Sequence, residues 1–250
     1  MLKAVLFDMG GTLEDIHYNE ETLKKAICRL DEILKGAGLD PQCSLEELSG
    51  RVMEGWDRYG AFRSLEDVEC KPDVIWCDYV LKDFDFPREQ LSSISETIAH
   101  MWEVTYYDRK LRPRVREMLD GLKKLGLKLG VVSNTAALYQ VFDILKEYGI
   151  RDCFCDVTLS SVVGLRKPRN EIFSVALHQM QIQPDEAVYV GDTVSRDIIG
   201  SKRAGFAAAI QIGSFLTREK DAGIKREFEP DYFIEDIYDV LPIVEGLAKE

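Results

Sequence analysis

Short apolar runs alternate with amphipathic stretches over most of the chain. The first run, Ala4–Phe7, is wholly apolar and ends at Asp8, as expected for a strand that is buried on both faces of a sheet. From Lys110 onward, further apolar runs are separated by segments of helical periodicity, and such repeated units predict a parallel sheet with helices on both faces. The predicted strands are Leu127–Val132, Val157–Leu159, Ala187–Val190, Ala207–Ile212 and Tyr232–Ile234, and the predicted helices are Val115–Leu125, Ala136–Tyr148, Asn170–Met180, Arg196–Ala204 and Ile237–Ala248.

Residues 16–108 follow a different pattern, in which long helical stretches are separated by turn signals. This pattern predicts a helical domain at 16–108, inserted into an α/β core made of residues 1–15 and 109–250. All three tryptophans fall in the insert, and we expect its aromatic residues to form its own core more often than to line a pocket. The predicted helices are Glu20–Lys35, Ser44–Arg58, Lys71–Leu81 and Pro87–Thr105.

Composition narrows the class of partner. The formal net charge of −12 repels polyanions, so we expect no nucleic-acid partner and no acidic membrane surface. A small anionic substrate stays compatible with this charge, because a metal ion and a few basic residues can dominate a pocket. No apolar run approaches the roughly 20 residues that span a bilayer, and the N-terminus lacks a signal-peptide layout, so we expect a cytoplasmic protein. No pattern indicates a particular oligomeric state.

The six cysteines form no C-x-x-C pair and lie beside no histidine at zinc-finger spacing. We therefore expect buried, reduced thiols rather than a metal or redox site.

Four short polar motifs lie at or just after the ends of predicted strands. Ligands bind at the carboxyl ends of strands in open α/β sheets, so these motifs are candidates for one common site. The motifs are Asp8-Met-Gly10-Gly11-Thr12, Val131-Val-Ser133-Asn134-Thr135, Gly164-Leu-Arg166-Lys167-Pro168 and Val190-Gly-Asp192-Thr193, the last followed by Asp197.

These residues also have structural interpretations. A lone buried carboxylate is costly, so Asp8 and Asp192 are most readily explained as a nucleophile or as metal ligands. Ser133 could instead cap the following helix, and Lys167 could be a solvated loop residue. Asp197 could pair with Arg196 or Arg203 on the surface, where we also expect Arg166 and Arg196 to lie. The three histidines, His17, His100 and His178, are scattered and predict no catalytic or metal cluster.

The ordered set of four motifs resembles that of the haloacid dehalogenase superfamily of hydrolases, most of which are Mg²⁺-dependent phosphatases. The resemblance covers essentially the whole chain, and it implies a Rossmann-like α/β core with an inserted α-helical cap. It also implies that a small phosphorylated metabolite is hydrolysed through an aspartyl-phosphate on Asp8. The implied metal ligands for Mg²⁺ are Asp8, the Gly10 carbonyl, Asp192 and Asp197; the implied phosphate-binding groups are Gly11, Thr12, Ser133, Asn134 and Lys167, and Lys167 also counts as catalytic.

Gly10 departs from the superfamily pattern Asp-x-Asp-Gly-Thr, in which the second aspartate protonates the leaving group and then activates water. Gly10 keeps the backbone carbonyl but has no carboxyl group, and a positioned general acid or base typically contributes about 10²–10⁴-fold to the rate. Three alternatives follow. The chain is a phosphatase with reduced or altered activity that uses a substitute acid from Glu14, Asp15, His17 or the cap; or it is a phosphate- and metal-binding regulatory module; or it hydrolyses a carbon–halogen or carbon–phosphorus bond.

Overall fold

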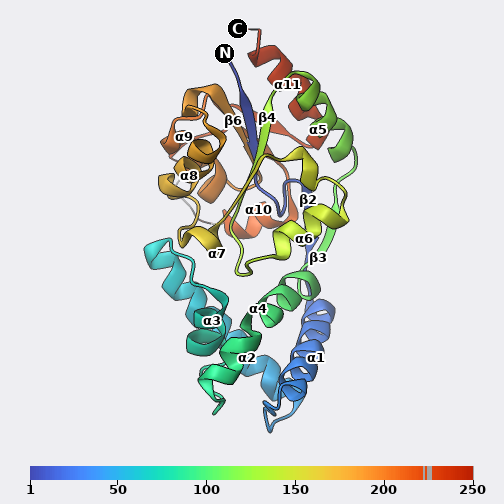
Figure 1. Cartoon of the computed structure of the whole chain (residues 1–250), viewed down its shortest axis with the longest axis vertical. Helices are drawn as coiled ribbons and strands as arrows, with labels where there is room; N and C mark the ends of the chain where they lie inside the picture. Colours follow the sequence, from blue (N-terminus) through green and yellow to red (C-terminus); the bar gives the residue numbers. More distant parts are fainter. Residues whose placement is uncertain (222, 224–226, 250) are drawn as a thin grey trace.

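In the residues that the computed structural model describes (1–221, 223 and 227–249), six parallel strands form one central sheet. Their order is β5-β4-β1-β6-β7-β8, so the N-terminal strand lies in the middle, as Figure 1 shows. Phe7 of this strand is level with Val131 on one side and with Val190 on the other. The predicted parallel sheet is thereby confirmed. The strands are β1 (Ala4–Phe7), β4 (Lys128–Ser133), β5 (Asp156–Leu159), β6 (Ala187–Gly191), β7 (Ala208–Ile212) and β8 (Tyr232–Ile234).

Helices cover both faces of the sheet. Because successive side chains of a strand point to opposite faces, Val5 and Phe7 pack in one apolar cluster and Ala4 and Leu6 in another. The first cluster includes residues of α5 (Val115–Lys124), α6 (Gln140–Glu147) and α11 (Val240–Leu247). The second includes residues of α8 (Asn170–Met180), beside which lies α9 (Ile199–Ala204).

Residues 20–105 form a helical unit at the end of the molecule that lies away from both termini (Figure 1). It has its own apolar core, in which the rings of Trp56, Trp76 and Trp102 lie 5.6–5.8 Å from one another. The expectation that most of its aromatic residues form a core is confirmed. The elements are α1 (Glu20–Gly36), α2 (Leu45–Glu66), α3 (Pro72–Val74), the π-helix η1 (Ile75–Val80) and α4 (Arg88–Thr105).

The chain enters and leaves the helical unit through two short strands that pair with each other. These are β2 (Glu14–His17) and β3 (Asp108–Leu111), which run antiparallel with Ile16 opposite Arg109. The sequence pattern did not predict them, because each strand has only four residues and most of those are charged. Glu14 is fully buried and forms an ion pair with Arg109, which ties the two connections together.

Several predicted boundaries shift for local reasons. The helix predicted from Ala136 begins only at Gln140, because the preceding backbone N–H groups have side-chain partners: that of Thr135 donates to Ser160 Oγ and that of Leu138 to Glu96.

The further short elements are η2 (Arg151–Cys153), α7 (Ser160–Val163), η3 (Pro184–Glu186), the π-helix η4 (Val194–Ile198), α10 (Phe215–Lys220) and η5 (Ile237–Asp239).

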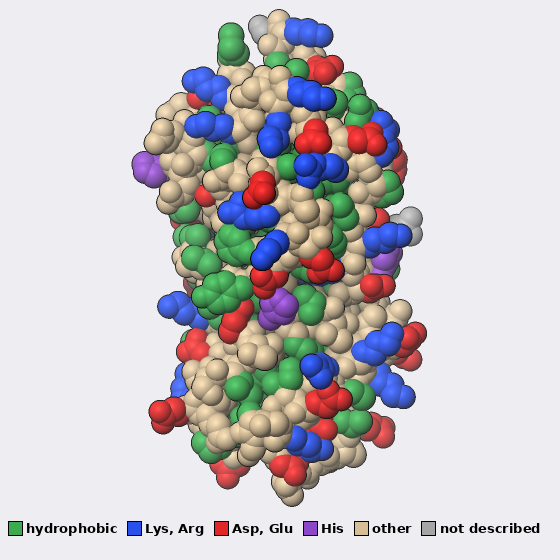
Figure 2. Space-filling model, turned by 45° about the vertical axis from the view of Figure 1, so that its right-hand side comes forward, with side chains coloured by type: hydrophobic (Ala, Val, Ile, Leu, Met, Phe, Trp, Pro, Cys, Tyr) green, Lys and Arg blue, Asp and Glu red, His purple; other side chains and the backbone are tan. Residues whose placement is uncertain are grey.

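Over the described part of the chain, no helix combines the length and the apolar character that a membrane crossing requires. All six cysteines are free, but the prediction that they are buried holds only for Cys153; Cys155 is exposed and the other four are partly buried. Figure 2 shows acidic and basic side chains intermixed over one face of the molecule.

Candidate active site

Asp8 lies directly after β1, at the carboxyl edge of the sheet, and its side chain is almost completely buried. Its Oδ1 atom accepts a hydrogen bond from the Met9 backbone N–H (2.7 Å) and lies 2.8 Å from Lys167 Nζ. One carboxylate oxygen is therefore fixed by a cation and a backbone donor. The second oxygen, Oδ2, is therefore the one available to react.

Lys167 is 2% exposed, so the interpretation as a solvated loop lysine is wrong. Its Nζ lies 2.7 Å from Asp197 Oδ1 and donates to Val132 O (2.9 Å) and to the Tyr189 hydroxyl (3.0 Å), in addition to the contact with Asp8. Asn134 holds the lysine backbone in place, because its Oδ1 accepts from the Lys167 N–H and its Nδ2 donates to the Lys167 carbonyl. The second and third motifs are thus joined directly.

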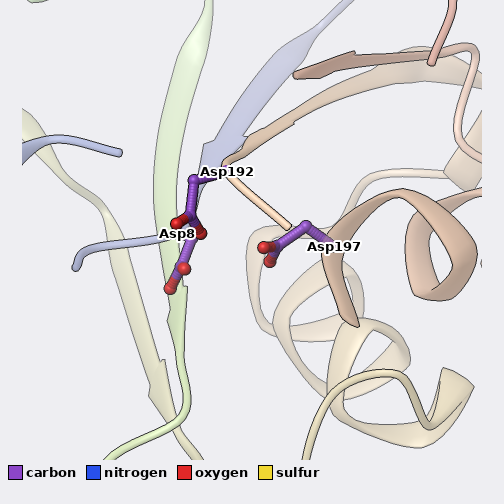
Figure 3. Close-up of side chains that lie close together, drawn as sticks. All are labelled: Asp8, Asp192 and Asp197. Carbon is purple, nitrogen blue, oxygen red and sulfur yellow. The ribbon is translucent and has the colours of Figure 1, made fainter. Parts of the chain in front are cut away.

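Three carboxylates from two motifs form one buried cluster. Asp8, Asp192 and Asp197 each place an oxygen within 4.8 Å of the others, and Figure 3 shows the three side chains facing one another. Their environments differ. Asp197 has hydrogen bonds to both oxygens: Oδ1 accepts from Lys167 and Tyr189, and Oδ2 from the Thr193 N–H and hydroxyl. Asp197 therefore pairs with the buried lysine and not with a surface arginine.

Asp192 is the member of the cluster with an unsatisfied oxygen. Its Oδ2 accepts from Ser214 Oγ (2.5 Å), whereas its fully buried Oδ1 has no hydrogen-bond partner in the described structure. Burying such an oxygen is costly unless something else satisfies it. Asp192 Oδ1 and Asp8 are therefore the atoms best placed to accept a cation.

The three carboxylates differ in how their surroundings shift their pKa values. Burial and the charges of Asp197 and Asp8 raise the pKa of Asp192 to about 7. Burial also raises the pKa of Asp8, against the opposing charge of Lys167. For Asp197, burial would raise the pKa as well, but the charges of Lys167 and Arg196 outweigh it and lower this pKa to about 2. A cation bound beside Asp192 would favour its ionised form.

Gly11 and Thr12 shape the turn after β1 rather than line the pocket described below. Gly11 has a φ of +85°, and a Cβ atom at this position would lie 2.3 Å from Asp192 Oδ2. Its N–H donates to the Glu14 carbonyl. Thr12 is fully buried. The two residues are thus not among those that line this pocket, and Thr12 Oγ1 has no hydrogen-bond partner in the described structure.

A pocket of about 200 Å³ opens beside Asp8, between the sheet edge and the helical unit. Asp8, Gly10, Ser133 and Asn134 line it, so residues of the first and second motifs meet there. Ser133 caps no helix, because α6 begins at Gln140 with Tyr139 before it. The remaining lining residues are Ile16, Tyr18, Arg63, Glu103, Tyr107, Arg109, Thr135, Ala136, Gln140, Arg166, Arg196 and Leu216.

The arginines of this pocket are the residues that sequence reasoning missed. Arg166 and Arg196 were expected at the surface, but both line the pocket. The side chain of Arg166 is 11% exposed because it pairs with the buried carboxylate of Glu69, which lies in the helical unit. Arg63 and Arg109 carried no motif signal. They reach the pocket because segments that are far apart in the sequence pack together.

The substitute acids proposed near the first motif do not line the pocket. Glu14 is fully buried between Arg109 and the Tyr148 hydroxyl, and Asp15 pairs with Arg112. His17 packs against the ring of Phe215. Glu103 of α4 does line the pocket, where Arg109 binds its carboxylate. Of the acids considered, Glu103 of the helical unit is thus the one that lines the pocket.

Comparisons with known proteins agree on one family of hydrolases. A family model described as haloacid dehalogenase-like hydrolase matches residues 2–205. Glyceraldehyde 3-phosphate phosphatase of Methanopyrus kandleri is 31% identical over the whole of both chains. Among solved structures, a HAD phosphatase from Thermococcus onnurineus is 26% identical with a TM-score of 0.64, covering 98% of this chain and 99% of the other. A 2-haloacid dehalogenase from Pseudomonas syringae, 21% identical, shares the fold with a TM-score of 0.68, covering 100% and 99%.

Proposed function

We propose, from the premise that this chain belongs to the haloacid dehalogenase-like hydrolases, that it is a Mg²⁺-dependent phosphatase of a small phosphorylated metabolite. In this proposal Asp8 is the nucleophile and carries an aspartyl-phosphate intermediate, and residues 16–108 act as a cap over the site. The relative named glyceraldehyde 3-phosphate phosphatase supports this substrate class. Glyceraldehyde 3-phosphate is accordingly the first substrate to assay.

The observation that carries the proposal is the position of Asp8. Asp8 lines a small pocket, and its carboxylate lies beside a buried lysine and close to a second carboxylate with an unpartnered oxygen. Phosphoryl transfer needs a nucleophile, a cation and donors to the phosphoryl oxygens, and this arrangement supplies the first and favours the other two.

The donor set fits Mg²⁺, which prefers one or two carboxylates and several waters. Asp8, Asp192 and the Gly10 carbonyl would hold the ion; when bound, it would neutralise charge on the phosphoryl oxygens. Asp197, expected as a further ligand, has both oxygens hydrogen bonded. We assign it instead to orienting Lys167.

The other residues then act on the substrate. Asp8 Oδ2 attacks phosphorus, and the bond between phosphorus and the leaving oxygen breaks. Ser133 Oγ and the Asn134 backbone N–H bind phosphoryl oxygens, while Lys167 stabilises their charge. Lys167 Nζ already has four partners, so it acts as a buried positive charge beside Asp8 rather than as an additional directional donor.

The first motif of this site supplies no group for proton transfer. The leaving oxygen needs a proton, and the later attack of water on the aspartyl-phosphate needs a base, but Gly10 offers neither. Glu103 lines the pocket and is our candidate for the base that activates water. Its ion pair with Arg109 favours the ionised carboxylate, so the leaving oxygen takes its proton from solvent. Phosphate esters with good leaving groups need little protonation, and we expect them to react fastest.

Two alternatives have less support. A metal-free displacement at a carbon–halogen bond would leave the unpartnered Asp192 oxygen beside Asp8 without a role. A binding module without turnover agrees with Gly10 but gives no reason for the fixed Asp8 carboxylate. Hydrolysis of an aryl phosphate that stops in EDTA and returns with Mg²⁺ would separate the phosphatase from both alternatives.

Metal binding should also be visible in thermal unfolding. Burial and the charges of Asp197 and Asp8 raise the pKa of Asp192 in the folded protein to about 7, above the usual value of about 4 for an aspartate. Between about pH 4 and about pH 7 the unfolded chain has lost this proton and the folded protein keeps it, so this contribution to stability falls as the pH rises. Mg²⁺ takes the place of the proton. We therefore expect the Mg²⁺-induced increase in melting temperature to be larger at about pH 8 than at about pH 5.

The matched control for this measurement is Asp192→Asn, which removes both the ionised carboxylate and its titration. Its melting temperature should respond little to Mg²⁺ at either pH. An equal Mg²⁺ response of the wild type and Asp192→Asn would contradict the metal assignment.

A further inference from the structure

The pocket beside Asp8 concentrates positive charge in a protein whose net charge is −12. Arg63, Arg109, Arg166 and Arg196 all line it, and each comes from a different part of the chain. They belong to α2, to β3, to the loop before α8 and to η4. This convergence contrasts with the intermixed charges on the face in Figure 2.

Three of these arginines already face carboxylates of the protein. Arg109 lies between Glu14 and Glu103, and Arg166 pairs with Glu69. The charges of Asp197, Asp192 and Asp8 act on Arg196. These three guanidinium groups are thus compensated at least in part without any ligand.

Arg63 is different. Among the described residues it has no ion pair within 4.0 Å and no hydrogen bond, and its guanidinium carbon lies 5.4 Å from the centroid of the Tyr59 ring. It is half-buried in the pocket wall. A guanidinium in this position has donors available for a planar anion.

The electrostatic neighbourhood of Arg63 agrees with this. Burial lowers the pKa of Arg166, and the positive charges of Arg63 and Arg196 lower it further. Arg63 also lowers the pKa of Tyr107 against the larger effects of burial and Glu103. Arg63 thus adds positive charge to a part of the pocket that is already cationic, and an anion bound there would relieve the repulsion.

Binding of the phosphoryl group does not account for the presence of Arg63 in the pocket. In the proposed function that group lies against Asp8, Ser133 and Lys167, at the edge of the sheet. Arg63 lines the same pocket but comes from α2 of the helical unit, not from the edge of the sheet. The volume of about 200 Å³ lies below the usual range for larger ligands, so the two ends belong to one small molecule.

We propose that the substrate carries a second anionic group, a carboxylate or a second phosphate, which Arg63 binds together with Arg166. This inference rests on the proposed function. It makes the helical unit the part that selects doubly anionic substrates.

The test compares pairs of substrates that differ in the second group alone. 3-Phosphoglycerate and glyceraldehyde 3-phosphate have the same carbon chain and differ in carboxylate against aldehyde. A diol bisphosphate and its monophosphate form the second pair and distinguish a phosphate-selective from a carboxylate-selective site. We expect the wild type to favour the doubly anionic member of at least one pair by about 10- to 100-fold in kcat/KM, the usual range for charge-assisted hydrogen bonds.

Arg63→Gln should reduce this preference by about tenfold or more, mainly through KM of the doubly anionic substrate. Arg29→Gln is the matched control, because it removes the same charge from an exposed position of the same helical unit. Its preference should equal that of the wild type. No preference for either dianion in the wild type, or an unchanged preference in Arg63→Gln, would overturn the inference.

Failure of the phosphatase proposal would look different. If no phosphate ester is hydrolysed, calorimetric affinities of the wild type and Arg63→Gln for 3-phosphoglycerate and glyceraldehyde 3-phosphate still report the second-anion site. Stronger binding of the acid that depends on Arg63 supports the inference without turnover, and equal binding of both compounds contradicts it.

Discussion

Asp8→Asn is expected to abolish hydrolysis of every phosphate ester, with a loss on the order of 10⁴- to 10⁶-fold in kcat, as for other enzymes that lose their nucleophile. The amide is nearly the same size as the carboxylate, but it is a poor nucleophile and cannot neutralise Lys167. Lys167 keeps its ion pair with Asp197, so the fold should survive. Steady-state hydrolysis of an aryl phosphate with Mg²⁺ measures the loss, and thermal unfolding checks the fold.

Asp15→Asn is the matched control for this prediction. Asp15 belongs to the same segment, but its carboxylate is 43% exposed, pairs with Arg112 and does not line the pocket. Its activity should stay within about threefold of the wild type. A folded Asp8→Asn protein that retains substantial activity would remove Asp8 as the nucleophile.

Gly10→Asp is expected to increase turnover of alkyl phosphates, by at least about tenfold and up to the 10²–10⁴-fold that general acid–base catalysis supplies. Gly10 has no positive φ, and its added Cβ would meet only Ile16 Cδ1, the far end of a flexible side chain, at 2.4 Å. The next atom is Arg109 Nη1 at 3.7 Å. The gain should be smaller for an aryl phosphate, because its leaving group needs less protonation. The ratio of the two rates is the measurement.

Gly10→Asn separates the acid from the added bulk, since it has the same shape and no carboxyl group. An increase in both variants would point to packing rather than proton transfer. Equal gains of Gly10→Asp on alkyl and aryl substrates would contradict the assigned role. A protein in which only Gly10→Asp turns over would favour the binding module over the phosphatase.

The alternating part of the fold could be predicted from sequence, because each buried strand is a continuous apolar run with turn signals around it. Ala4–Phe7 and Ala187–Val190 are clear examples, and the second is extended only by Gly191 in the structure. β2 and β3 could not be predicted in this way. Their charged residues are stabilised by contacts with distant segments, among them the buried pair between Glu14 and Arg109 and the pair of Asp15 with Arg112.

The predicted site residues divide in the same way, into those whose position follows from the sheet topology and those whose position depends on long-range packing. Asp8, Ser133 and Asp192 lie at strand ends, and the ends of parallel strands meet at one edge of the sheet, so their proximity follows from topology. The burial of Lys167 and the convergence of the arginines do not. Lys167 is buried by its contacts with Asp8, Asp197 and Tyr189 inside the core. The arginines converge where the helical unit packs on the sheet, as in the pair of Glu69 with Arg166, whose members are far apart in sequence.

The most direct test of the central claim is to look for the phosphoryl group on Asp8. The wild type is mixed with Mg²⁺ and an aryl phosphate, quenched in acid during turnover, and digested for peptide mass spectrometry. Gly10 cannot activate water, and Glu103 is held by Arg109 and is a weaker base for it. Breakdown of the intermediate should therefore be slow and the adduct should accumulate. The account predicts one phosphoryl group on the peptide that contains Asp8, dependent on Mg²⁺ and absent from Asp8→Asn; turnover that leaves Asp8 unmodified at every quench time would contradict it.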